Sequence, residues 1–230
     1  MSQLALPLRL ADHAIFDTFL AAGNEPLVDY LQSLTHAAPG QGAWIWGASA
    51  TGKTHLLQAT CERFGDRAAY VPLAELAELA GAGPGLLEGL ESRQLVCIDD
   101  LDSVAGDEAW ERALFVLCND VSEAGHHLVV SAMSAPRESA IALADLRSRL
   151  QRLATFHLRE LADAGRVAAL QLRARHRGLE LPDDTARYLM ARSRRDMRSL
   201  YELLDKLDLE ALRAQRRLTI PFVKDVLQSV

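Results

Sequence analysis

Residues 47–54 read G-A-S-A-T-G-K-T, which matches the phosphate-binding P-loop pattern G-x-x-x-x-G-K-[ST] at every fixed position. In such a loop the glycines let backbone N–H groups surround a β-phosphate without side-chain clash. The lysine reaches the β- and γ-phosphates, and the hydroxyl ligates Mg²⁺. Gly47, Gly52, Lys53 and Thr54 supply these groups. The motif predicts that the chain binds a nucleotide together with Mg²⁺.

The sequence on either side of the loop fits this prediction. The apolar run A43-W44-I45-W46 predicts a buried strand, and residues 52–64 predict a helix whose N-terminus faces the phosphates. Further apolar runs predict strands that alternate with helices as far as about residue 158, at 68–71, 95–98, 128–131 and 155–158. Residues 160–227 carry helical patterns only. We therefore predict a parallel α/β sheet followed by an α-helical lid.

A second motif supplies acidic groups. The run L95-V96-C97-I98-D99-D100 is an apolar strand that ends in two aspartates, which is a Walker B pattern. Asp99 is expected to hold the Mg²⁺ shell. Asp100 stands where many such ATPases place a glutamate that polarises water, and its alternative role is a cap or loop carboxylate. Ser131, at the end of the next strand, is either a sensor of the γ-phosphate or water, or a buried hydroxyl bonded to backbone.

The composition is that of an ordinary globular protein of 230 residues, with 49% hydrophobic and 24% charged residues. The sequence has no run of 18 apolar residues and no basic segment typical of a signal peptide, so we expect a cytoplasmic protein without a membrane helix. The three cysteines are widely spaced in apolar patterns, which favours reduced core residues: Cys61, Cys97 and Cys118.

The charge is unevenly distributed along the chain. Residues 1–146 carry 7 Lys and Arg against 20 Asp and Glu, a net charge of −13, whereas residues 147–230 carry 18 against 11, a net charge of +7. Three interpretations remain open: ordinary solvated helix faces, head-to-tail contact between the acidic lobe of one subunit and the basic lobe of another, or nucleic acid on the basic lobe.

At this point the sequence resembles the DnaA branch of the AAA+ family, and within it the regulatory inactivators of DnaA. The motifs that carry the resemblance are G-K-T-H-L-L at 52–57, I-D-D-L at 98–101, D-L-R-S-R-L at 145–150, R-D-M-R-S-L at 195–200 and L-T-I-P-F-V-K at 218–224. The resemblance implies an AAA+ P-loop NTPase core over residues 11–158 and an α-helical lid over residues 159–230.

The resemblance also implies roles for two arginines. By match to S-R-L, Arg149 is the finger that reaches into a neighbouring subunit's nucleotide site, with Arg147 as the alternative. By match to R-D-M-R, Arg198 on the lid contacts the phosphates of the chain's own nucleotide. The sequence departs from the family at S131-A132-M133, where an acid is often found, and this departure argues against efficient ATP hydrolysis by the chain alone. We also expect no helix-turn-helix DNA-binding domain after the lid.

The leader Q-L-A-L-P-L at 3–8 resembles the peptide motif that binds the bacterial sliding clamp. An extended peptide of this kind can place the Gln3 amide on backbone groups and the side chains of Leu4, Leu6 and Leu8 near apolar pockets. Pro7 restricts the backbone before binding and so lowers the entropic cost of docking. We therefore interpret residues 1–10 as an extended clamp-binding tail.

Together these features imply a regulator of replication initiation. It would bridge the DNA-loaded sliding clamp and ATP-bound DnaA, stimulate hydrolysis of the DnaA-bound ATP, and contact DNA only through the clamp. Its own ligand would be ADP or ATP with Mg²⁺, and the resemblance implies that ADP is the active one. The first alternative is a DnaA-like or helicase-loader ATPase that acts directly on DNA, against which the pI of about 5.6 argues. The second is a metabolic P-loop kinase, for which the sequence carries no substrate signature.

Deleting residues 1–8, or changing both Leu6 and Leu8 to Ala, is expected to abolish binding to the sliding clamp, because the apolar contacts of the tail are lost. Nucleotide binding should be unchanged, since the P-loop lies elsewhere in the sequence. The measurement is the affinity for purified clamp, and an undiminished affinity after the deletion would contradict the interpretation of the tail.

Overall fold

The computed structural model describes residues 14–35, 40–194 and 196–228. These residues form two compact units. The first, called the core unit here, comprises residues 14–16, 24–35, 40–49 and 53–159. The second, called the helical unit, comprises the described residues from 160 onward together with two short segments, 17–23 and 50–52.

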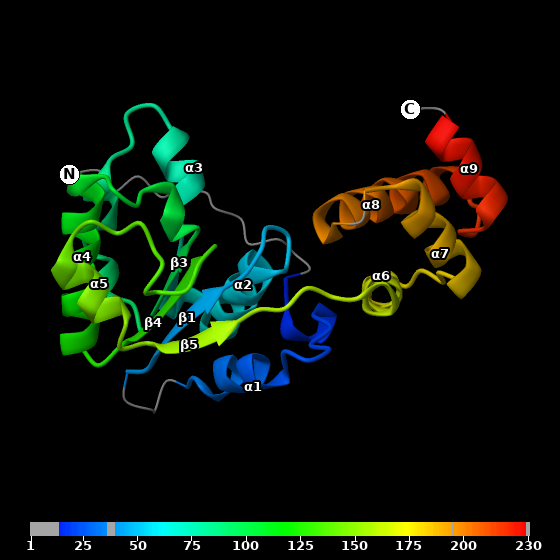
Figure 1. The fold of residues 1–230 in the computed structure, drawn as a ribbon. Helices are drawn as coiled ribbons and strands as arrows, with labels where there is room; N and C mark the ends of the chain where they lie inside the picture. Colours follow the sequence, from blue (N-terminus) through cyan, green and yellow to red (C-terminus); the bar gives the residue numbers. More distant parts are fainter. Residues whose placement is uncertain (1–13, 36–39, 195, 229–230) are drawn as a thin grey trace. The chain divides into compact units, whose positions relative to one another are not determined.

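The core unit is built on a five-stranded sheet in the order β2-β3-β4-β1-β5, and every neighbouring pair is parallel (Figure 1). The strands are β1 (Gly42–Trp46), β2 (Ala68–Pro72), β3 (Leu95–Asp99), β4 (His127–Ala132) and β5 (Ala154–His157). β3 and β4 are buried along their whole length, as expected for central strands covered on both faces. The predicted parallel sheet flanked by helices is confirmed.

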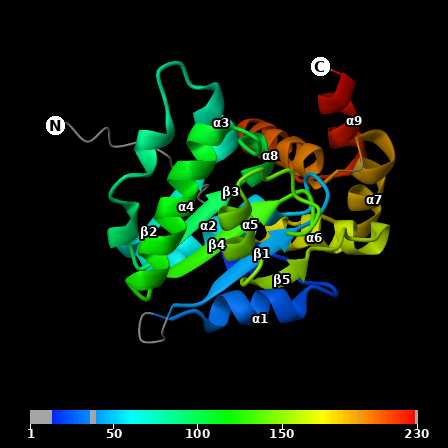
Figure 2. The same cartoon turned by 60° about the vertical axis from the view of Figure 1, so that its left-hand side comes forward.

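Helices cover both faces of this sheet, as Figures 1 and 2 show. One face is covered by α1 (Glu25–Ser33) and α2 (Lys53–Phe64), and the other by α4 (Glu108–Glu123) and α5 (Ala144–Leu150), while α3 (Leu73–Glu78) follows β2. The sequence pattern predicted α2 closely, as a helix over residues 52–64. The seven-residue α5 was not predicted as a helix, because its two buried residues, Leu146 and Leu150, are too few to give a periodic pattern.

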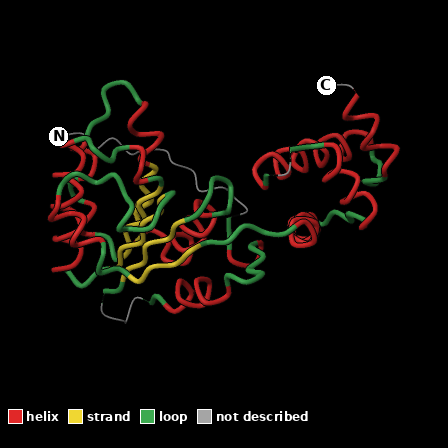
Figure 3. Tube along the Cα trace, viewed as in Figure 1, coloured by secondary structure: helices red, strands yellow, loops and turns green. Residues whose placement is uncertain are grey.

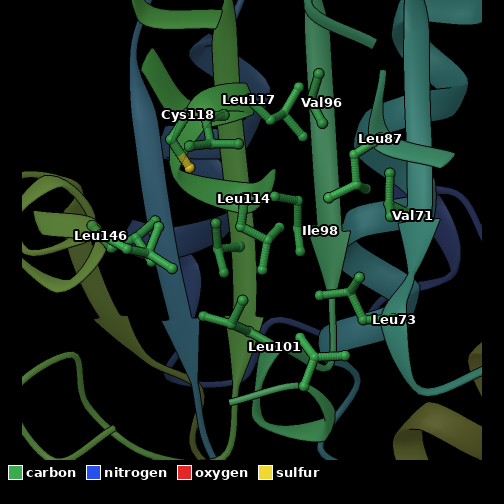
Figure 4. Packing of buried hydrophobic residues seen from close by; sticks show 14 of the residues in the cluster. Val71, Leu73, Leu87, Val96, Ile98, Leu101, Leu114, Leu117, Cys118 and Leu146 are labelled. Carbon is green, nitrogen blue, oxygen red and sulfur yellow. The ribbon is translucent and has the colours of Figure 1, made fainter. Parts of the chain in front are cut away.

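The main hydrophobic core lies between the sheet and α4. Leu114 and Leu117 of α4 pack against Val96 and Ile98 of β3 in one buried cluster, which Leu146 of α5 extends (Figure 4). The cysteines are buried and form no disulfide, as the sequence predicted. Burial raises the pKa of the Cys118 thiol to about 12, although the positive charge of Arg149 acts in the opposite direction.

The helical unit contains only helices and loops among its described residues (Figure 3). The helices are α6 (Asp163–His176), α7 (Asp183–Arg192), α8 (Met197–Ala214) and α9 (Ile220–Gln228). Their buried faces form a separate apolar cluster around Leu170, Leu189 and Leu204. This unit is the predicted C-terminal helical lid. None of the helices in the described parts of the chain combines the length and apolarity needed to cross a membrane.

Leu114→Ala is expected to destabilise the core unit by about 2–5 kcal/mol, because the side chain is 1% exposed and its removal leaves a cavity. Val116→Ala on the same helix is the matched control. Val116 is 55% exposed, so this change should alter the free energy of unfolding by no more than about 0.5 kcal/mol.

Urea unfolding followed by tryptophan fluorescence is the measurement. All three tryptophans, Trp44, Trp46 and Trp110, belong to the core unit, so the signal reports that unit. Equal midpoints for the two variants would contradict the packing described for α4.

Candidate nucleotide-binding site

The lysine of the P-loop lies at the start of α2, directly after the loop. Lys53 is 5% exposed, and its Nζ donates hydrogen bonds to the Gly47 carbonyl at 2.8 Å and to the Ala48 carbonyl at 2.9 Å. Thr54 follows as the second residue of the helix and is partly buried. The ammonium group is therefore held against the backbone of the loop that precedes it.

The backbone of the loop explains why a glycine stands at position 52. Gly52 has φ +105°, a conformation that residues with a side chain rarely adopt. A Cβ atom at this position would also lie 2.8 Å from Cε2 of Phe19. A side chain at this position would therefore be both strained and in steric conflict.

Asp99 ends β3 and is the most constrained polar residue of the site. Its side chain is 2% exposed, and each of its two oxygens accepts a hydrogen bond from a hydroxyl. Oδ2 accepts from Tyr70 Oη of β2 at 2.7 Å, and Oδ1 accepts from Ser131 Oγ of β4. Burial and the nearby Asp99 charge both raise the pKa of Tyr70, so the phenol stays protonated and remains a donor. The carboxylate is thus bonded from both neighbouring strands.

Ser131 and Asp100 lie beside this carboxylate. Ser131 is fully buried, and its Oγ also accepts a hydrogen bond from the Asp100 backbone N–H at 2.9 Å. The Ser131 hydroxyl is thus buried and bonded to backbone, which is one of the two roles considered for it, and its sensor role stays a prediction. Asp100 adopts φ +54°, an uncommon conformation for a residue other than glycine and one that often occurs at functional sites. Its role toward water stays a prediction.

The charges around Lys53 oppose the effect of its burial. Burial lowers the pKa of Lys53, whereas the carboxylates of Asp100, Asp99 and Asp102 act to raise it. Asp102 also accepts a hydrogen bond from the Met133 backbone N–H at 2.5 Å, which joins the loop after β3 to the end of β4. Neither Tyr70 nor Asp102 was among the residues predicted from the sequence. Asp102 could have been found as the third acid of D99-D-L-D, whereas nothing in the sequence near Tyr70 indicates its contact with Asp99.

The oxygen groups of the site suit an Mg²⁺ ion that is also coordinated by the phosphates of a nucleotide. In the described parts of the chain, no three His, Cys, Asp or Glu side chains are grouped so that they could hold a metal ion by themselves. Mg²⁺ commonly takes one or two protein oxygens and completes its shell with phosphate and water. The buried Asp99 carboxylate and the Thr54 hydroxyl fit that requirement.

The two arginines considered for the finger both lie on α5. Arg147 is bonded locally, since its Nη1 donates to the Ile141 carbonyl at 3.1 Å. Arg149 is partly exposed, and across residues 14–35, 40–194 and 196–228 no hydrogen bond or salt bridge involves its side chain. The Arg149 guanidinium is therefore the one of the two that remains available for an external anion.

The other predicted residues lie in the helical unit or fall outside the described residues. Arg198 is exposed in the first turn of α8, next to the N-cap Asp196, and its phosphate contact stays a prediction. The backbone N–H of Ser199 donates to Asp196, which lowers the pKa of that carboxyl. The tail residues Gln3, Leu4, Leu6, Pro7 and Leu8 lie outside the described residues.

Comparison with known proteins finds a family match for the lid and solved structures of the same fold. Residues 163–227 match the family described as Hda, lid domain. Domain III of the Thermotoga maritima replication initiation protein DnaA has the same fold, with a TM-score of 0.77, 18% identity, and coverage of 96% of this chain and 98% of that chain.

Two further solved structures share the fold. AMPPCP-bound DnaA from Aquifex aeolicus aligns with a TM-score of 0.63 and 20% identity over 83% of this chain and 62% of that chain. The Thermotoga maritima RuvB branch migration motor aligns with a TM-score of 0.65 and 16% identity over 90% of this chain and 70% of that chain. The AAA+ fold is thereby established for both the core and the lid.

Lys53→Ala is expected to lose most of the thermal stabilisation by ADP or ATP, because the charge-assisted contacts to phosphate are removed. A ligand at 100 times its dissociation constant stabilises the native state by about 2.7 kcal/mol, so the wild-type chain should melt several degrees higher with nucleotide. Lys224→Ala changes an exposed lysine of α9 and is the control. Equal shifts of melting temperature in Lys53→Ala and the wild type would refute the assignment of the site.

Proposed function

We propose that this chain, an Hda-like AAA+ protein related to DnaA by its lid and its fold, is a regulator of replication initiation. It bridges the DNA-loaded sliding clamp and ATP-bound DnaA and stimulates hydrolysis of the DnaA-bound ATP, which prevents re-initiation. The observation that carries the proposal is the match of residues 163–227 to the Hda lid. The available arginine on α5 supplies a chemical means for it.

In this proposal the chain binds ADP or ATP through its own P-loop. The backbone of residues 47–52 would hold the phosphates, and the Lys53 ammonium, which bonds the Gly47 and Ala48 carbonyls, would be their cationic partner. Thr54 and Asp99 would hold Mg²⁺, which would neutralise phosphate charge. Arg198 contributes from the lid. The acid often found after this strand is missing at S131-A132-M133, so we expect the chain's own ATP turnover to be slow.

Arg149 acts on the nucleotide of DnaA rather than on the chain's own. Phosphoryl transfer spreads negative charge over the γ-phosphate oxygens, and a guanidinium placed there stabilises that charge. Arginine suits this task because it is permanently protonated and donates two parallel hydrogen bonds. An arginine finger raises hydrolysis by about 10³–10⁵-fold, or roughly 4–7 kcal/mol of barrier.

The clamp supplies proximity in this mechanism. Docking of the tail on a ring that encircles DNA holds the chain close to DNA-bound DnaA and raises the effective concentration of Arg149. The chain then needs no DNA-binding surface of its own, and it acts in the cytoplasm at the replisome. Head-to-tail self-association of this chain would use the same helix, α5, with its Arg149.

Arg149→Ala is expected to reduce stimulation of DnaA ATP hydrolysis by about 10³-fold or more, because the transition-state charge loses its guanidinium. Arg149→Lys should recover little, since an ammonium lacks the planar fork. Binding of ADP and of the clamp should be unchanged. The measurement is release of labelled phosphate from DnaA charged with labelled ATP, in the presence of DNA-loaded clamp.

Arg152→Ala, an exposed arginine just beyond α5, is the matched control and should stimulate like the wild type. Loss of stimulation in Arg147→Ala but not in Arg149→Ala would move the finger to Arg147. Full stimulation by both variants would refute activation in trans. Rapid ATP turnover by the chain alone with single-stranded DNA would favour the DnaA-like or helicase-loader alternative.

A further inference from the structure

A buried carboxylate on α4 connects two loops of the core unit. Glu111 is 2% exposed, and it accepts three hydrogen bonds from backbone N–H groups. Oε1 accepts from Gly106 at 2.7 Å and from Ala142 at 2.9 Å, and Oε2 accepts from Leu143 at 2.6 Å. One side chain therefore holds both the loop that leads from β3 into α4 and the segment that leads into α5.

The bonds to Ala142 and Leu143 hold the N-cap residue of α5 and the residue before it. Leu143 is the N-cap residue of α5, and its side chain has no oxygen to accept a hydrogen bond. Backbone N–H groups at and before the start of a helix need acceptors that the helix itself does not supply. The Glu111 carboxylate satisfies two of them from outside the helix.

The segment fixed in this way carries both arginines of α5. Leu146 and Leu150 anchor one side of this helix in the core, and Glu111 fixes its beginning. The Arg147 side chain bonds to Ile141, in the same segment, so it reinforces this attachment. Arg149 is then presented from a seven-residue helix whose direction depends on the core packing and on one carboxylate.

We propose that Glu111 is a positioning residue for Arg149: its carboxylate fixes the segment before α5 and thereby sets the direction in which Arg149 reaches a neighbouring subunit's nucleotide. This inference rests on the proposed function for the role of Arg149, but the attachment of α5 can be measured without DnaA. Glu111→Gln keeps the size of the side chain, yet its amide NH₂ group replaces an acceptor and faces a backbone N–H donor.

The first measurement is the mobility of α5 itself. A spin label at Ser148→Cys, an exposed site on α5, should become markedly more mobile in Glu111→Gln, whereas a label at Ser122→Cys near the end of α4 should not change. The native cysteines are buried and do not compete for the label. Glu108→Gln, an exposed glutamate one turn earlier on the same helix, is the control and should leave both labels unchanged.

The second measurement is stimulation of DnaA ATP hydrolysis. Glu111→Gln should reduce stimulation by about 100-fold, the size of effect expected when a catalytic group is displaced by about 1 Å. The double variant Glu111→Gln/Arg149→Ala should be no worse than Arg149→Ala alone, because the two changes remove the same interaction. The melting-temperature shift on adding ADP should equal that of the wild type.

Three outcomes would overturn the inference: an unchanged label at Ser148, unchanged stimulation while Arg149→Ala is defective, or losses from Glu111→Gln and Arg149→Ala that simply multiply. A mobile label combined with full stimulation by Arg149→Ala would instead refute the arginine finger and support the attachment of α5. Where Glu111→Gln does not fold, Glu111→Asp tests the same point, since it keeps the charge and shortens the reach by one methylene.

Discussion

The site depends on the need to satisfy one buried carboxylate. A charged group removed from water is tolerated only when hydrogen bonds replace its hydration. Asp99 meets this need through hydroxyl donors from both neighbouring strands, Tyr70 of β2 and Ser131 of β4. These donors can reach it because β2, β3 and β4 are adjacent and parallel, so their carboxyl ends lie at the same edge. The buried Walker B acid therefore requires this order of strands, because the order brings both hydroxyl donors to it. The P-loop follows β1 and lies at the same edge of the sheet.

A second buried carboxylate, that of Glu111, also accepts hydrogen bonds from its surroundings, but its role is to join two segments of backbone. Glu111 accepts only from backbone groups, and these belong to segments that no regular secondary structure would otherwise hold together. Most of the acidic residues of the core unit give it a negative surface, but these two are internal and determine geometry. Asp99 organises the end of the sheet where phosphate is expected, and Glu111 organises the start of the helix that carries Arg149. The proposed nucleotide site and the proposed finger helix are thus each organised by a different buried acid of the core unit.

Part of the basic charge of the C-terminal part is paired within the helical unit. Arg173 is 5% exposed and pairs with Asp205, which also accepts from Arg177 at 2.8 Å. Four further arginines of this unit form ion pairs on its surface: Arg166, Arg187, Arg213 and Arg216. Exposed pairs of this kind add little stability, but they leave fewer free cations for a phosphate backbone. Of the three interpretations of the charge asymmetry, this pattern favours solvated helix faces.

Local sequence patterns were enough to predict three features: the phosphate-binding loop from the glycines and lysine of residues 47–54, the strands from their apolar runs, and the lid from its helical periodicity. Each of these features depends on residues that are close together in the sequence. A period of two residues in a strand, or of 3.6 in a helix, can therefore be detected directly. The helix over residues 144–150 was seen only in the folded chain. The same holds for the hydrogen bonds from Tyr70 to Asp99 and from Leu143 to Glu111. These contacts join residues that are about 30 positions apart, so no local pattern records them. They arise because the packing of sheet and helices brings the partners together, and because buried polar groups must then find a partner.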